Sequence, residues 1–548
     1  MRKGKTPSVR SWVAALAAMA GVSASCNALV DTNVEQCRTT ADCVAKGGQF
    51  VTAVCTPERV CSLGGDCFTN QECIDRFDGQ LAICRKPDRS CVALRTADCQ
   101  DVFPEAAIAD DDTLLLGMLA PLRGEFASSG IPPWEGVQLA VNELDKFGNG
   151  LPLPGSAARR RVAFLACHDI DDHLRAARHL AQVVRVGAIV GPQFSGITLD
   201  VANKVTIPAG TLIISPSATS TAITDLQDNG LVWRTAPSDA IQAIPLAHVV
   251  TEIEARVRAQ LNLAATDRIR VAVTVKGDAY GLGLASAVLG QLQFNGQPAL
   301  GSQNAPFFLR SDYPDPSDQP SYDFATLVES LVAFQPHITL LLGTTESVTK
   351  VLAGIESQWT SVNRPVYVLG DGGRDEELLP MIGATPALAQ RVVGTLPGRT
   401  TALFAQFASS YKGFHQNKDP GSYADTAYDA AYLLAYAAVA AGKSQLTGSD
   451  FNAGLKKMVG GTKVPSGPDG INSAFKLLGE QANIDFDGVS GPLDFDVSTG
   501  EAPSDIVVWC TEIDAGNKPT FVTSGQYYDS IASTMVGTRA ACAGLVGD

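Results

Sequence analysis

The sequence has few histidines, little positive charge and, after its first residues, no long apolar run. Only 6 of the 548 residues are histidine, and 42 Lys and Arg stand against 57 Asp and Glu, which gives a net charge of −15. This excess of negative charge argues against nucleic acid and anionic membrane surfaces as partners. No apolar run beyond residue 25 reaches the ~18 residues that a transmembrane helix needs. We therefore expect no membrane-spanning helix in the mature chain.

The composition is that of a folded protein with several domains. Hydrophobic residues make up 45% and charged residues 18% of the chain, which is typical of globular proteins. The length predicts about three or four folded units.

Residues 1–25 have the pattern of an export signal. Basic residues come first, the apolar run 12–22 follows, and small residues precede Cys26, as in secretory signal peptides. The end of this segment resembles a bacterial lipobox, in which the cysteine becomes the lipidated first residue, although Ser23 replaces the usual Leu. We expect an extracytoplasmic lipoprotein that touches the membrane only through lipid on Cys26, with cleavage and release as the alternative.

Ten of the 13 cysteines lie between residues 26 and 99. After Cys26 they form two tandem repeats of four cysteines, at 37–61 and 67–91, in which CRTTADC is echoed by CFTNQEC. An exported polar segment of this size is normally stabilised by disulfides. Zinc is the alternative, but the repeats lack histidine, so disulfides are favoured. Four cysteines allow three pairings, and the spacing does not choose among them.

Four cysteines remain outside the repeats when Cys26 is set aside. We expect Cys99 to pair with Cys167, which would join the repeats to the main domain, and Cys510 to pair with Cys542. Residues 101–112 are acidic and contain a proline, which is consistent with a short spacer. Residues 26–112 are thus predicted to form a cysteine-rich module and linker.

From residue 113 onward, short apolar runs alternate with longer helical patterns. This order predicts a parallel sheet with helices on both faces, and the 436 residues from 113 to 548 suffice for two such α/β lobes. The predicted strands are 114–119, 161–166, 186–190, 211–214, 231–234, 268–275, 305–309, 337–342, 365–369 and 391–395. The predicted helices are 134–147, 172–185, 195–206, 239–262, 281–294, 322–334 and 346–358.

Two of the predicted strands, 186–190 and 211–214, are followed by small hydroxyl residues and a candidate helix start. In a parallel sheet both strand ends open on the same carboxyl edge, where ligands bind. Free backbone N–H groups at a helix start suit a carboxylate or another small anion. The segment 191–221 therefore predicts a ligand pocket.

No catalytic or cofactor motif accompanies this pocket. Ser195 is not in a Gly-x-Ser-x-Gly elbow, because positions 193 and 197 are Gln and Ile. Gly281-Leu-Gly283 lacks the third glycine and the ribose-binding acid of a dinucleotide fingerprint. We expect a binding protein without enzymatic activity, cofactor or metal.

Eight motifs in order resemble the type I periplasmic binding proteins, in the branch of leucine/isoleucine/valine-binding proteins and their amide- and aromatic-acid-binding relatives. Together they cover residues 113 to about 500, whereas the cysteine repeats lie outside the resemblance. The motifs are LGMLAPL at 116–122, GVQLAVN at 136–142, AIVG at 188–191, ISPSAT at 214–219, WRTAPSD at 233–239, DAYGLG at 278–283, TAYD at 426–429 and FDGVSG at 486–491.

The resemblance implies two lobes, joined by three chain crossings, that close on a small molecule like a hinge. The crossings would lie near residues 235–236, 396–397 and 492–493. Lobe I would then contain 113–236 and 397–491, and lobe II would contain 237–396 and 492–548.

The resemblance also implies six ligand-binding residues. Ser195 matches the serine that binds the ligand carboxylate, and Tyr280 matches an aromatic residue that closes over the ligand. Asp371 lies one residue from the acid that pairs with the ligand ammonium, a position that strict alignment gives to Gly372. The full set is Ser195, Ser217, Thr219, Tyr280, Asp371 and Tyr428, in which Ser217 and Thr219 hold the head group and Tyr428 is a pocket aromatic.

Two departures from the family pattern change the wall of the pocket. Thr344 and Ser129 stand where the amino-acid binders have aromatic residues, so hydroxyls replace rings. The resemblance therefore implies a solute-binding protein for a small polar ligand, such as an amino acid, an amide or a related organic acid, with an ABC permease as partner. The alternative is a ligand sensor of the same fold that signals to a membrane partner.

Overall fold

The structure is a computed structural model. It describes residues 36–47, 53–55, 59–62, 67–264, 266–398, 401–514, 516, 518–539 and 542. The predicted export signal 1–25 and the lipidation site Cys26 lie outside these residues. The chain divides into two compact units, Met1–Phe68 with Lys86–Ser90 and Thr69–Arg85 with Cys91–Asp548. None of the helices in the described part of the chain has the length and apolar character needed to span a bilayer.

In its described residues, the first cysteine repeat contains three short elements and two disulfides. Its elements are α2 (Thr40–Val44), β1 (Val54–Cys55) and β2 (Cys61–Ser62). Cys37 is bonded to Cys55 and Cys43 to Cys61, each across 18 residues of sequence. The predicted disulfides are confirmed here, and the first cysteine pairs with the third and the second with the fourth.

The second repeat contains α3 (Asn70–Arg76), β3 (Ala82–Arg85) and β4 (Ser90–Ala93). Helix α3 begins after Thr69, whose hydroxyl accepts a hydrogen bond from the backbone N–H of Glu72, as a capping box requires. Cys73 is bonded to Cys91, again across 18 residues. The second cysteine of this repeat therefore pairs with the fourth, as in the first repeat.

The first lobe is built on a six-stranded sheet with the order β12-β11-β10-β6-β9-β5. All neighbours are parallel except β5, which runs antiparallel to β9 at the edge. Its strands are β5 (Cys99–Phe103), β6 (Leu114–Ala120), β9 (Val162–His168), β10 (Ala188–Val190), β11 (Leu212–Ser215) and β12 (Val232–Arg234). The parallel strands confirm the prediction made from the alternating pattern.

Strand β5 corrects the predicted spacer. Cys99 lies opposite Cys167 in the register of β5 and β9, and the two residues form a disulfide. The predicted pairing is thus confirmed, but residues 101–103 belong to the edge of the sheet rather than to a linker. The pattern of this strand is too polar to be recognised alone, because its exposed residues Gln100 and Asp101 face solvent.

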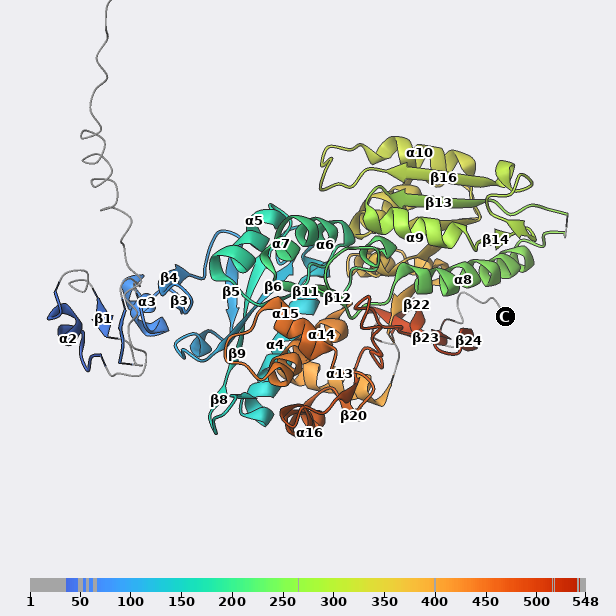
Figure 1. Cartoon of the computed structure of the whole chain (residues 1–548). Helices are drawn as coiled ribbons and strands as arrows, with labels where there is room; N and C mark the ends of the chain where they lie inside the picture. Colours follow the sequence, from blue (N-terminus) through green and yellow to red (C-terminus); the bar gives the residue numbers. More distant parts are fainter. Residues whose placement is uncertain are drawn as a thin grey trace, which may run out of the picture. The chain divides into compact units, whose positions relative to one another are not determined.

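Helices cover both faces of the first sheet, as Figure 1 shows. Alternate residues of β9 enter different cores: Phe164 packs with the helices of one face and Leu165 with those of the other. One face carries α4 (Ile131–Gly148), α13 (Ala402–Phe414), α14 (Ala424–Ala441), α15 (Gly448–Leu455) and α16 (Pro468–Gly479). The other carries α5 (His173–Arg178), η5 (His179–Val184), α6 (Ser195–Val201), η6 (Ala202–Thr206) and α7 (Ile207–Ala209).

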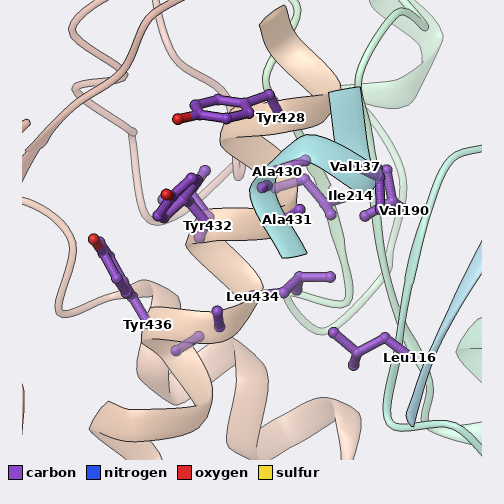
Figure 2. Close-up of a cluster of buried hydrophobic side chains, with 14 of the residues drawn as sticks. Leu116, Val137, Val190, Ile214, Tyr428, Ala430, Ala431, Tyr432, Leu434 and Tyr436 are labelled. Atoms are coloured by element: carbon purple, nitrogen blue, oxygen red, sulfur yellow. The ribbon is translucent and has the colours of Figure 1, made fainter. Parts of the chain in front are cut away.

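Helix α14 is the central helix of this lobe and is buried along nearly its whole length. Its many alanines let other elements approach closely, and Gly136 of α4 has no side chain because a Cβ there would collide with the carbonyl of Ala424. Figure 2 shows three tyrosine rings, Tyr428, Tyr432 and Tyr436, following one another along one side of α14. Leu434 points from the same helix toward the strand residues.

The second lobe is built on an eight-stranded sheet with the order β16-β13-β17-β18-β19-β22-β23-β24. The first five strands are parallel, and the last three join them in antiparallel fashion. They are β13 (Val271–Lys276), β16 (Phe308–Tyr313), β17 (Ile338–Leu342), β18 (Val366–Leu369), β19 (Val392–Pro397), β22 (Ile506–Ile513), β23 (Pro519–Asp529) and β24 (Thr534–Gly537). The disulfide between Cys510 and Cys542 is present as predicted.

Helices also cover both faces of the second sheet. One core contains residues of α8 (Asp239–Gln260) and α9 (Ala279–Leu289). The other contains residues of α10 (Phe324–Phe334), η9 (Ser347–Leu352), α11 (Ala353–Gln358) and α12 (Leu378–Ala384). The remaining short pairs are β7 (Leu151–Pro152) with β8 (Arg159–Arg160), β14 (Gln293–Phe294) with β15 (Gln297–Pro298), and β20 (Thr462–Pro465) with β21 (Ile484–Asp487).

Two sequence-based boundaries are corrected in this lobe. The helix predicted over 281–294 ends at Leu289, because Asn295 and Gly296 adopt positive φ angles and form a tight turn between β14 and β15. The strand predicted over 305–309 begins only at Phe308. The three residues before it form a 3₁₀ turn after Asn304, whose buried side chain donates hydrogen bonds to nearby carbonyls.

The chain passes between the two sheets after β12, after β19 and again before β22. These passages agree with a fold of two lobes joined by three connections. The residues at which each lobe ends, 236 and 396–397 and 491–492, stay a prediction.

Candidate functional site

The ends of β10 and β11 are tied together by hydroxyl groups. The Ser215 hydroxyl donates to the carbonyl of Pro192 at 2.7 Å and accepts from the backbone N–H of Ala218 at 3.0 Å. Ser217 donates to the carbonyl of Gln193 at 2.8 Å. Gly191 begins the first loop with a φ of 102°, and a Cβ there would collide with the carbonyl of Leu119. These bonds fix the two loops relative to each other at the carboxyl edge of the first sheet.

Ser195 begins α6 and is almost completely buried, with 2% of its surface exposed. Its Oγ accepts a hydrogen bond from the backbone N–H of Ser220, at 3.2 Å, which belongs to the loop after β11. The hydroxyl proton of Ser195 remains available to a ligand. Ser195 therefore lies between the two strand-end loops, as the sequence predicts.

A cavity of about 50 Å³ opens beside these loops, and residues of both lobes line it. The first lobe contributes the loop residues around Ser195, and the second contributes side chains that follow β13, β17 and β18. The lining residues are Ser129, Gln193, Phe194, Ser195, Ser217, Tyr280, Thr344, Asp371, Gly372 and Tyr423. Four of the six predicted binding residues, Ser195, Ser217, Tyr280 and Asp371, thus come together in one cavity.

Asp371 is the charged group of this cavity and comes from the second lobe. Its Oδ1 accepts from the Gln242 amide at 2.7 Å and from the Tyr280 hydroxyl at 2.8 Å, and its Oδ2 accepts from the Tyr423 hydroxyl. Burial raises the pKa of Asp371, and the three hydrogen bonds oppose this shift only in part. A buried carboxylate without a cation gains most from a positively charged or donor-rich ligand.

Asp239 is a second buried carboxyl close to this cavity. Burial raises its pKa well above the usual range, and the nearby charge of Asp371 raises it further. Among the described residues, neither carboxyl oxygen of Asp239 has a hydrogen-bond partner. Its backbone N–H donates to the carbonyl of Thr219 at 2.8 Å, so Thr219 lies beside Asp239 and behind the cavity rather than on its wall.

Tyr428, another of the predicted binding residues, is not in the lining of this cavity. It lies in the core of the first lobe, where its hydroxyl donates to Glu143 and its ring packs 4.9 Å from that of Phe407. Two tyrosines line the cavity, Tyr280 and Tyr423. Tyr423 precedes α14 with a φ of 63°, so it is not on the side of the helix that carries Tyr428, Tyr432 and Tyr436. The family resemblance points to Tyr428, whereas Tyr423 is not among the predicted binding residues.

Thr344 and Ser129 line the cavity, as expected from the two departures in the family pattern. The Thr344 hydroxyl donates to Glu346 at 2.6 Å and accepts from the Lys276 ammonium at 3.4 Å. Lys276 also lies 3.2 Å from Asp278 and 5.5 Å from the ring centre of Phe194 in the other lobe. The wall of the cavity is therefore polar on the side where a ligand side chain would lie.

Contacts between the lobes keep the cavity small. Ser128 donates to Asp375 at 3.0 Å, and Arg374 donates to Ser422 at 2.9 Å, each bond joining one lobe to the other. Pockets that bury drug-sized ligands usually have volumes of about 300–1,000 Å³. The cavity is well below this range.

Comparison with known proteins identifies the family. A profile described as periplasmic binding protein matches residues 113–478, which is most of the chain. The chain belongs to the periplasmic binding protein family. Its members are extracytoplasmic, and the fold of two α/β lobes is that of their type I class. The cysteine repeats precede the matched region.

One curated relative of this binding protein is the Leu/Ile/Val-binding protein BraC3 of Rhizobium johnstonii. It is 31% identical over 198 residues, which are 35% of this chain and 47% of the relative. The match thus spans about half of the relative's length.

Solved structures share the fold. A leucine-binding protein from Thermotoga maritima has a TM-score of 0.55 at 18% identity, with 75% of this chain and 97% of that chain covered. A solute-binding protein from Rhodopseudomonas palustris, in complex with 3,4-dihydroxybenzoic acid, has a TM-score of 0.55 at 17% identity, with 76% and 98% covered.

Three residues at or near the cavity, Asp239, Tyr423 and Gln242, were not among the predicted binding residues. Asp239 ends the motif WRTAPSD, one of the eight that carry the family resemblance. Tyr423 has no such signal, because its role depends on the bend before α14. Gln242, which donates to Asp371, lies one turn after Asp239 on α8 and is also outside the motifs.

Proposed function

We propose that this binding protein closes its two lobes on a small polar ligand with a donor-rich head group and delivers it to an ABC permease. The ligand class is an amino acid, an amide or a related organic acid. The observation that carries the proposal is that Ser195 of the first lobe and Asp371 of the second line one cavity. A ligand that contacts both side chains favours the closed arrangement over the open one.

The charges of the cavity support a ligand with a positively charged group. Asp371 is buried without a lysine or arginine in the lining of the cavity, and an ammonium group would compensate its carboxylate. On the opposite wall, Ser195 and the strand-end loops offer hydroxyl and backbone donors, which suit a carboxylate. A zwitterionic head group satisfies both walls. Tyr280 and Tyr423 would contact it through the hydroxyls that now donate to Asp371.

The names of the relatives support transport rather than sensing. The curated relative is called a Leu/Ile/Val-binding protein, and a related structure is described as the solute-binding protein of an ABC transporter. No reaction or cofactor is part of the proposal. We also propose that residues 1–25 direct export and that Cys26 carries the lipid anchor, with the chain otherwise outside the membrane.

The test is a thermal-shift screen of residues 27–548 against amino acids, amides and aromatic acids, followed by calorimetry. A ligand that binds only the native state raises the melting temperature. With a ligand found in this way, Ser195→Ala should weaken binding by about 1–3 kcal/mol because one hydrogen bond is lost. Asp371→Asn should weaken binding of an ammonium-bearing ligand by at least about 1.4 kcal/mol, or tenfold.

The control is Asp318→Asn, which removes one negative charge from an exposed turn of the second lobe. This variant should bind as the parent protein does. If Ser195→Ala and Asp371→Asn both fold and bind with unchanged affinity, the cavity is not the ligand site. Silence of the parent protein across the whole panel would exclude the proposed ligand class.

A further inference from the structure

A second hollow lies in the second lobe, at the opposite edge of its sheet from the cavity. It has a volume of about 460 Å³, and the residues that begin the parallel strands line it. Arg270 precedes β13, His337 precedes β17 and Arg391 precedes β19. Strands of five or six residues separate this edge from the carboxyl edge by about 17–20 Å. The hollow is therefore separate from the cavity between the lobes.

The charge of this hollow is opposite to that of the chain. The chain carries a net charge of −15. The lining of the hollow nevertheless contains Arg256, Arg270, Arg364, Arg391 and His337, and no Asp or Glu. We call these five residues and the hollow between them the arginine groove.

Part of this charge is compensated by carboxylates outside the lining: Glu252 acts on Arg256, and Glu356 acts on Arg391 and Arg364. Glu356 accepts from both terminal nitrogens of Arg391, at 2.8 and 2.7 Å, and from Arg364 at 3.0 Å. Two guanidinium groups thus share a single negative charge, and one positive charge remains. This arrangement also fixes the planes of both guanidinium groups, which reduces the entropy cost of binding an anion.

Arg270 is held in place without a carboxylate. Its Nε donates to the carbonyl of Gln335 at 2.8 Å, at the end of α10. Within the described chain, its two terminal nitrogens form no hydrogen bond or ion pair. A guanidinium group fixed by one edge presents the other donors in the fork geometry that matches carboxylate and phosphate oxygens.

His337 adds a further donor. Its Nδ1 accepts the backbone N–H of Arg270 at 2.9 Å, so in the neutral ring the hydrogen is on Nε2. Burial and the charges of Arg270 and Arg258 lower the pKa of His337, which keeps the ring neutral near pH 7. The Nε2–H of His337 can therefore donate a hydrogen bond to a ligand oxygen in the groove.

The floor of the groove is apolar. Ile253 and Val257 of α8, Leu261 directly after this helix, and Trp359 belong to its lining. The volume is within the range of small-molecule pockets. We propose that the arginine groove is a second ligand site, for a small anion that carries two or more carboxylate or phosphate groups. Binding there does not depend on the cavity between the lobes.

The test uses citrate and pyrophosphate as probes, titrated calorimetrically into the mature protein, with sodium chloride at equal ionic strength as reference. We expect saturable binding of at least one probe, which weakens as salt is added. Arg270→Gln should weaken it about tenfold or more, because a bidentate charge-assisted pair is lost. Arg256→Gln provides a second variant in case Arg270→Gln fails to fold.

The matched control is Arg310→Gln, which removes one arginine from the same sheet outside the groove. Arg310 is bonded to Asp312 at 2.8 Å on the edge strand β16. The control should bind the probe within about twofold of the parent, as a distant exposed charge requires. Absence of saturable binding of both probes, or an equal loss in Arg310→Gln, would overturn the proposal. Asp371→Asn should leave probe affinity unchanged, which separates this site from the cavity.

Discussion

Asp169 is a buried carboxyl group in the core of the first lobe. It follows β9 directly, none of its surface is exposed, and neither carboxyl oxygen has a hydrogen-bond partner among the described residues. Burial raises the pKa of Asp169 to about 8. Since the same group titrates near 3.9 in an unfolded chain, the folded protein binds more protons than the unfolded chain between these two values.

This proton difference predicts a pH-dependent stability. The free energy of unfolding should fall as pH rises from about 4 to about 8, by up to about 1.4 kcal/mol per pH unit, because Asp169 must lose its proton in the core. Asp169→Asn mimics the protonated form and should remove this slope. Urea unfolding at pH 5 and pH 8 checks it: the variant should match the parent at pH 5 and exceed it at pH 8. An equal difference at both pH values would contradict the assignment.

Among the elements, α14 and the residue before it carry tyrosines that have different partners. Tyr428 and Tyr432 both donate to Glu143, whose pKa is raised by burial. Tyr423, just before the helix, donates to Asp371 of the other lobe. Neighbouring tyrosines therefore serve the core of one lobe and the cavity between the lobes.

Substitutions of two of these tyrosines should therefore affect different properties, stability in one case and ligand affinity in the other. Tyr428→Phe should lower the free energy of unfolding by about 1–3 kcal/mol, because a buried acceptor loses a donor. It should leave ligand affinity unchanged. Tyr423→Phe should weaken ligand binding instead. Chemical unfolding and calorimetry of both variants provide the measurements, and a loss of affinity in Tyr428→Phe alone would return that residue to the binding site.

The elements also mark the limit of what the sequence predicts. Continuous apolar runs at 186–190 and 211–214 predict β10 and β11, because strands buried on both faces need apolar residues at every position. The family resemblance points to Ser195 and Ser217 in the loops after β10 and β11, and to Tyr280 and Asp371 after β13 and β18, and all four line the cavity. Strand β5 and Tyr423 do not follow, since a long-range disulfide places the first and a backbone bend places the second. Neither feature leaves a periodic pattern in the residues around it.

At the scale of the molecule, a disulfide between residues far apart in the sequence stabilises the folded chain. The bond between Cys99 and Cys167 spans 68 residues and joins the edge strand β5 to β9. In the chain-entropy description, closing a loop of this length stabilises the native state by about 4 kcal/mol.

We therefore expect the double variant Cys99→Ala with Cys167→Ala to lower the free energy of unfolding by about 2–5 kcal/mol. Ligand affinity should not change, because neither cysteine lines the cavity. Denaturant titration under oxidising conditions measures the change. Cys510→Ala with Cys542→Ala, whose bond spans only 32 residues, is the comparison, and no loss of stability in the first variant would exclude a structural role for β5.

The position of this bond has a mechanical consequence. The chain enters the first lobe through β5 and reaches the second lobe only after β12. The disulfide between Cys99 and Cys167 fastens the entering strand β5 to β9, so the amino end is linked to the second lobe only through the first. If Cys26 is anchored to the membrane as we propose, the first lobe holds the anchored end of the chain, and the second lobe is attached to it through the connections after β12, after β19 and before β22.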